Sequence, residues 1–179
     1  MVQEKQGGGW AVLYQNEVVR FCSKSAVLFA LRDAKQTEKL RRMNGEKAHL
    51  QTVFMEFADI TEGASGREGR WSSKVVFALS ENELIQFGQW LLGRFKGQIE
   101  IGPHHGKILY LESNLESGTF GVRLANGKRS DGGVVHSVYL PQTVVFRVMP
   151  LVLRALSSLT LLSTQEVLIM LRGMPLASR

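Results

Sequence analysis

The second half of the chain repeats the hydrophobic pattern of the first half at an offset of 61 positions. In each half, alternating apolar residues that predict a β-strand lead into a stretch with apolar residues at helical spacing, over 81–92 and over 142–159. The apolar residues that coincide at this offset are Phe77 with Val138, Leu79 with Leu140, Leu84 with Val145, Phe87 with Val148 and Leu91 with Val152. We therefore expect a duplicated unit of several strands closed by one helix.

The first unit contains several short stretches of alternating hydrophobicity. They predict strands over 10–14, 17–21, 49–60 and 74–79. The segment 25–47 has two interpretations, and the pattern leaves both open. It is either a helix whose apolar stripe stops before the basic residues, or a strand followed by a basic loop.

The second unit shows a clearer succession of strands. Alternation predicts them over 98–102, 107–112, 119–125 and 134–140. Asn126-Gly127 predicts a hairpin turn after the third of these strands, because both residues tolerate positive φ, and a glycine-rich connection would follow over 128–133.

Capping signals mark where the predicted helices begin. Ser80 with Glu83, and Ser163 with Glu166, have the spacing of a capping box, in which serine and glutamate satisfy each other's backbone N–H groups. Pro141 opens the second helix, where a backbone N–H would have no hydrogen-bond partner within the helix.

Together these elements predict an α+β fold of duplicated antiparallel four-strand-plus-helix units with an additional C-terminal helix. We expect residues 1–9, which end in three glycines, to be a flexible lead. Residues 10–179 would then form a single globular domain, made of two pseudo-repeats over about 10–97 and 98–160 and a C-terminal helix over 163–172.

Composition narrows the function classes. The 179 residues are 44% hydrophobic, which is enough for a buried core, and the net charge of +6 favours an anionic partner. The single cysteine, Cys22, excludes an intramolecular disulfide. Arg147, Pro150 and Arg154 interrupt the longest apolar segment, and the N-terminus lacks the apolar stretch of a signal peptide. We therefore expect a cytoplasmic protein with no membrane association.

Two successive units of four strands and a helix on a basic chain resemble the Whirly type of fold, over about residues 10–160. Whirly proteins carry a Lys-Gly-Lys-Ala-Ala-Leu signature on a strand. The nearest match here, Gly106 to Leu111, keeps a Gly-Lys and one leucine. The same fold is found in the single-stranded-DNA-binding coactivators known as positive cofactor four and in mitochondrial RNA-binding proteins of kinetoplastids. The resemblance implies nucleic-acid binding on a sheet surface, often by oligomers.

The alternation also predicts a binding surface. If the apolar residues of the second unit face the helices, Tyr110, Arg123 and Tyr139 share the outer face of its sheet. Lys107 and Lys128 would lie close to the ends of this sheet. Aromatic rings offer stacking surfaces to unpaired bases, and cations track phosphates.

Further basic and aromatic residues would extend this surface. They are Arg129 after the hairpin turn, and Arg20, Trp71 and Lys74 in the first unit. The alternative interpretation is an ordinary outer sheet face, or one that is buried in an oligomer.

No residue pattern predicts a cofactor, a metal site or a small-molecule substrate. Adjacent residues on a strand point to opposite faces, so His104-His105 is a poor pair of metal ligands. Glu100 and Glu112 lie on neighbouring predicted strands. They would either pair with Arg123 or hold a metal for nuclease chemistry.

From these observations we expect a non-enzymatic, homo-oligomeric protein that binds single-stranded nucleic acid, with DNA weakly favoured over RNA. Its basic, aromatic outer sheet face would stack bases and contact phosphates. A protein-interaction or scaffold module without nucleic-acid activity is the alternative, and a metal-dependent nuclease is a third.

Overall fold

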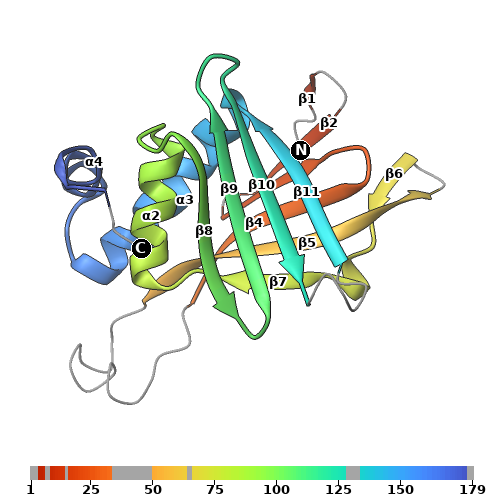
Figure 1. The fold of residues 1–179 in the computed structure, drawn as a ribbon, viewed down its shortest axis with the longest axis horizontal. Helices are drawn as coiled ribbons and strands as arrows, with labels where there is room; N and C mark the ends of the chain where they lie inside the picture. The colour runs from red at the N-terminus through yellow and green to blue at the C-terminus, as the bar shows by residue number, and fades with distance from the viewer. Residues whose placement is uncertain are drawn as a thin grey trace.

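Two antiparallel sheets that cross at a steep angle, with helices at one side, form the framework in the computed structural model (Figure 1). The structure describes residues 4–6, 9–14, 16–33, 50–63, 66–127 and 134–176.

The first sheet is a meander of seven strands in which β6 and β7 both pair with β5. Its strands are β1 (Glu4–Gln6), β2 (Gly9–Tyr14), β3 (Glu17–Phe21), β4 (Ser25–Asp33), β5 (Gln51–Gly63), β6 (Gly66–Gly69) and β7 (Val75–Ala78). A short 3-10 helix, η1 (Trp71–Ser73), precedes β7. The strand interpretation of the segment after residue 25 is therefore correct for Ser25–Asp33, and the predicted basic loop lies outside the described residues.

The second sheet is a meander of four strands in sequence order. These are β8 (Gly97–His104), β9 (Lys107–Asn114), β10 (Thr119–Asn126) and β11 (Val134–Pro141). β10 and β11 are antiparallel neighbours paired as far as Asn126 opposite Val134, so the hairpin predicted at Asn126-Gly127 is present and its connection begins at Gly127. Gly127 does adopt a positive φ of 83°.

The helices are α2 (Glu81–Leu91), α3 (Gln142–Thr160) and α4 (Thr164–Gly173). Both predicted capping boxes are present. The side chain of Glu83 accepts from the backbone N–H of Ser80 at 2.8 Å, and that of Glu166 accepts from the backbone N–H of Ser163 at 2.8 Å. Pro141 is the last residue of β11 and the N-cap of α3, which begins at Gln142 as the pattern over 142–159 predicts.

The sequence repeat corresponds to a structural repeat. All ten residues that coincide at the offset are buried, which gives β7 and α2 the same inward-facing positions as β11 and α3. Strands β3, β4, β5 and β7 followed by α2 thus match β8, β9, β10 and β11 followed by α3, while β1, β2 and β6 are additions to the first unit. The duplicated α+β fold with an additional C-terminal helix is confirmed.

Aromatic side chains join the two units across one continuous core. Phe29 of the first sheet stacks on Phe87 of α2 with ring centroids 6.2 Å apart. Trp90 of α2 is fully buried and meets the ring of Phe120 on β10 edge-on at 5.1 Å. The helix between the two units therefore contacts both sheets.

By length and composition alone, α3 is also apolar enough to cross a membrane, with a mean hydropathy of 1.4. Its buried residues nevertheless form one face against the core: Val144, Val145, Val148, Leu151, Val152, Ala155 and Leu156. Packing against the sheets and α2 thus accounts for the apolar face of this helix.

Gly88 brings the three helices into close contact. A Cβ atom at this position of α2 would lie 3.0 Å from Leu171 Cδ1 of α4 and 3.3 Å from Val152 Cγ1 of α3. We expect Gly88→Leu to lower the free energy of unfolding by about 1–3 kcal/mol, because the added side chain overfills this contact. Urea denaturation measures the difference.

The matched control is Gly173→Ala at the end of α4, where a Cβ atom would meet nothing within 4 Å. Its free energy of unfolding should stay within about 0.5 kcal/mol of the wild-type value. Equal stabilities for the two variants would contradict the close packing of α4 on α2.

Candidate nucleic-acid interface

The outer face of the second sheet presents two complete rows of side chains across its four strands. Alternate residues of each strand face outwards, and the strand register aligns them into rows that run across the sheet. The first row consists of Gln98, Glu112, Gly121 and Tyr139, and the second of Glu100, Tyr110, Arg123 and Ser137. The predicted grouping of Tyr110, Arg123 and Tyr139 on one face is therefore found in the structure.

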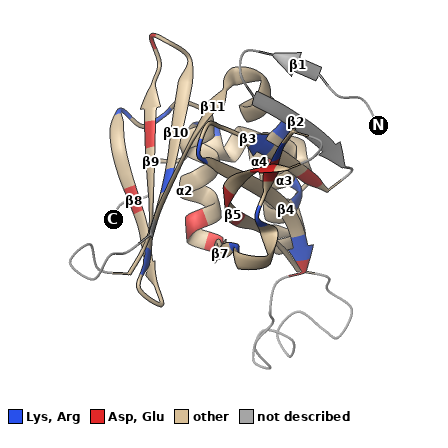
Figure 2. Cartoon of the chain, turned by 90° about the vertical axis from the view of Figure 1, so that its right-hand side faces the viewer, with Lys and Arg blue, Asp and Glu red and all other residues tan. Residues whose placement is uncertain are grey.

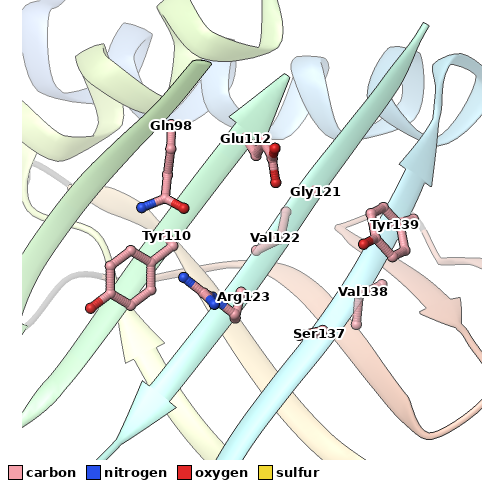
Figure 3. Close-up of a pocket in the computed structure, with 9 residues that line it drawn as sticks. All are labelled: Gln98, Tyr110, Glu112, Gly121, Val122, Arg123, Ser137, Val138 and Tyr139. Atoms are coloured by element: carbon pink, nitrogen blue, oxygen red, sulfur yellow. The ribbon is translucent and has the colours of Figure 1, made fainter. Parts of the chain in front are cut away.

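A shallow hollow of about 190 Å³ lies over these rows (Figure 3). Gly121 leaves its floor free of a side chain. A Cβ atom there would be 3.6 Å from both Cβ of Glu112 and Cε1 of Tyr139, so these two residues border the space from either side. Tyr139 is 63% exposed, an unusual degree for a large aromatic residue in the middle of a strand.

Arg123 stacks on its neighbour in the row. Its Cζ atom lies 4.5 Å from the centroid of the Tyr110 ring, a cation–π arrangement that orients both side chains. Glu100 lies opposite Tyr110, and Glu112 lies opposite Gln98, so the two carboxylates are diagonal neighbours. In the described part of the chain, no three potential ligands gather to hold a metal ion.

The prediction of a basic face is not met by the described side chains of this sheet. Glu100 and Glu112 are exposed there against one exposed cation, Arg123. Figure 2 shows the acidic positions on β8 and β9. Lys128 and Arg129 lie outside the described residues.

Lys107 points away from this face. It alternates with the buried residues Leu109 and Leu111, so its side chain projects between the two sheets. There its ammonium group donates a hydrogen bond to the carbonyl oxygen of Val76 on β7 at 2.5 Å. Lys107 lies three residues before Tyr110 on β9, and this odd separation directs the two side chains to opposite faces of the sheet.

Arg20, in contrast, reaches the edge of the candidate interface. Its Nε atom donates to the carbonyl oxygen of Tyr139 at 3.3 Å, and Cys22 Sγ lies 3.8 Å from the same oxygen. The first sheet therefore holds the free edge of β11 at the residue that carries the exposed ring.

Trp71 and Lys74 lie on the opposite side of the first sheet. The ring of Trp71 meets that of Phe21 edge-on at 6.4 Å. Lys74 Nζ pairs with the buried carboxylate of Glu56 at 2.5 Å, and Arg32 pairs with the same carboxylate at 3.1 Å. Both predicted residues therefore make their described contacts within the first sheet, and none of these contacts is with Tyr139.

His136 is a notable residue of β11 that the sequence analysis did not single out. It is buried, stacks on Phe57 with ring centroids 6.0 Å apart, and lies 3.5 Å from Asp59 Oδ1. Neither ring nitrogen has a hydrogen-bond partner among the described groups. Burial lowers the pKa of His136, against the opposing effect of Asp59. Its alternation with Val138 and Leu140 was the signal that could have placed it inside.

The buried histidine predicts a pH-dependent stability. Because its pKa is lowered in the folded protein, the unfolded chain takes up the proton first, and the free energy of unfolding should fall as the pH drops below about 6.5. His136→Phe keeps a ring against Phe57 and removes the titrating group. Its stability should therefore depend less on pH than that of the wild type.

Urea denaturation at pH values from about 8 down to about 5.5 tests this expectation. Hydrogen bonds with Ser163 lower the pKa of Glu166, so this carboxylate titrates below that range. His105→Asn, at an exposed hairpin position, serves as the control and should retain the wild-type slope. An unchanged slope in His136→Phe would contradict the assignment.

The fold has counterparts among solved structures. The chain is similar to WHY1 from Arabidopsis thaliana, with a TM-score of 0.55 and 15% identity over 83% of this chain and 92% of that chain. It is also similar to MRP1/MRP2 of Trypanosoma brucei, with a TM-score of 0.53 and 14% identity over 76% of each chain. A scan against protein-family models and a search of curated proteins gave no match. These likenesses concern the fold, which is Whirly-like, as the order of the elements predicts.

Proposed function

We propose that this protein binds single-stranded nucleic acid on the outer face of its second sheet, as a binding protein and not as an enzyme. The exposed ring of Tyr139 beside the hollow above Gly121 carries the proposal. An unpaired base needs a flat apolar surface with room above it, and the exposed Tyr139 ring beside the hollow offers both. A Whirly-like fold and a net charge of +6 support the same function.

The charges on this face suggest how a single strand of nucleic acid would lie across the sheet. Glu100 and Glu112 on β8 and β9 repel phosphates, whereas Arg20 stands at the free edge of β11. The sugar-phosphate backbone would therefore follow the β11 side, with its bases directed towards β9. Arg123, between these two zones, would contact a phosphate or stack beside a base.

Substitutions on this face should weaken binding. We expect Tyr139→Ala to reduce the affinity for a single-stranded oligonucleotide by about 5- to 100-fold, since one stacked base is lost. Tyr139→Phe keeps the ring and should retain most of the affinity. Fluorescence anisotropy with labelled single-stranded DNA, single-stranded RNA and duplex DNA measures the loss and identifies the preferred strand.

Two further variants make the test specific to this face. Arg123→Ala should weaken binding and flatten the dependence on salt, whereas Arg172→Ala, an exposed cation on α4, should leave both unchanged. Trp71→Ala on the opposite face should also leave the affinity unchanged. A loss of affinity in Trp71→Ala without a loss in Tyr139→Ala would place the interface on the first sheet.

A second candidate function is protein interaction through the helices. Phe146 on α3 is 81% exposed, Leu161 after it is 88% exposed, and Ile169 on α4 is 62% exposed. Burial of these apolar side chains against another protein would be favourable. We propose a second copy of the chain as the partner.

If the helices mediate self-association, polar substitutions there should dissociate the assembly. We expect the double variant Phe146→Ser, Ile169→Ser to sediment as a smaller species than the wild type, because the apolar contact is lost. Sedimentation velocity at several protein concentrations measures this. Wild-type protein that sediments as a monomer throughout would contradict self-association.

A further inference from the structure

We propose that the hollow above Gly121 selects guanine among unpaired bases, and that Glu112 recognises its Watson–Crick edge. The inference rests on the proposed function, since it concerns the base that would stack on Tyr139. It extends that function from a sequence-tolerant surface to one with a base preference.

The position of Glu112 is the first observation. Its side chain borders the hollow on β9, with Gly121 on the adjacent strand and Tyr139 one strand further (Figure 3). It forms no ion pair or hydrogen bond with any described residue. An ionised carboxylate only accepts hydrogen bonds, so a ligand in the hollow must present donors to it.

Phosphate is excluded as that ligand by charge. Glu112 and the nearby Glu100 would both repel it, whereas the edge of a neutral base meets no such repulsion. An acidic group bordering a nucleic-acid surface is therefore explained by contact with a base. Recognition of unpaired bases through their Watson–Crick edges while they stack on aromatic rings is common in single-strand recognition.

Among the bases, guanine offers the matching edge. Its N1–H and N2–H₂ groups are adjacent donors, and they pair with both oxygens of one carboxylate. Adenine and cytosine present a single amino group next to a ring nitrogen that accepts. Thymine and uracil present one N–H between two carbonyl groups. Each of these directs an acceptor at the carboxylate, which disfavours the contact.

The dimensions of the row fit a purine. Adjacent strands lie about 4.8 Å apart, so Glu112 and Tyr139, two strands apart, are separated by about 10 Å at the backbone. Gly121 between them adds no side chain, and the Tyr139 ring leans over it towards Glu112, since a Cβ atom at Gly121 would lie 3.6 Å from both Tyr139 Cε1 and Glu112 Cβ. A base that stacks on the Tyr139 ring can extend its edge across this gap towards Glu112.

The test compares oligonucleotides that differ at one base. A nine-nucleotide thymidine strand carries a central guanine, hypoxanthine, adenine or cytosine. Hypoxanthine keeps the N1–H of guanine and lacks the N2 amino group. We expect wild-type protein to bind the guanine strand about five-fold more tightly than the hypoxanthine strand, as measured by fluorescence anisotropy.

Three variants assign this preference to the hollow. Glu112→Gln should abolish the ratio between guanine and hypoxanthine. Glu100→Gln removes the same charge from the neighbouring row, outside the lining of the hollow, and should keep the ratio. Gly121→Val should abolish it by filling the space, since its Cβ atom meets only ordinary contacts at 3.6 Å and the strand fold is preserved.

The outcomes separate this inference from the proposed function. If the wild type binds all four oligonucleotides equally and Tyr139→Ala weakens this binding, the guanine preference is overturned and the stacking function remains in place. A Glu112→Gln variant that binds every strand more tightly by the same factor also overturns it, because the carboxylate then only repels phosphate. Failure to bind any strand overturns both proposals. Urea denaturation of each variant confirms that it is folded.

Discussion

Burial of one face of each sheet against the same core determines which side chains reach solvent. Side chains alternate along a strand, so once Val122 and Leu124 are inside, Gly121 and Arg123 must be outside. The register between strands then aligns these outward positions in rows. The candidate interface is thus a consequence of how the core packs, and a shift of one residue in β10 would remove it.

The sequence alone predicted the repeat, most strands, the helix caps and the outward group of Tyr110, Arg123 and Tyr139. These features depend on local alternation and spacing, which a single sequence contains. Contacts between the units depend on the angle at which the sheets cross, and no local pattern records that angle. The contact of Arg20 with Tyr139, and the contact of Trp71 with Phe21, therefore required the structure. The inward direction of Lys107 is different, because its alternation with Leu109 and Leu111 already indicated it.

The net positive charge of the chain does not translate directly into a binding surface. Several described cations have structural partners. Arg94 donates to the carbonyl oxygens of Leu171 and Met174 at the end of α4, Lys107 to that of Val76, and Lys74 pairs with Glu56. These three cations contribute to the long-range field that attracts an anionic partner, but their described partners hold them away from the outer face of the second sheet. Aromatic exposure and open space are therefore better guides to the interface than charge.

The duplication also shows why one sheet and not the other carries the candidate site. When β7 is aligned on β11, the strand registers make Ala78 equivalent to Tyr139, Phe54 equivalent to Gly121 and Glu56 equivalent to Arg123.

On the first sheet, Phe54 therefore occupies the position that Gly121 has on the second sheet, and Ala78 occupies the position of Tyr139. This exchange fills the space that forms the hollow on the second sheet. The buried carboxylate of Glu56, held by Arg32 and Lys74, further closes that face. The two halves thus share their core positions, and among the described residues only the second half has an open surface beside an exposed tyrosine.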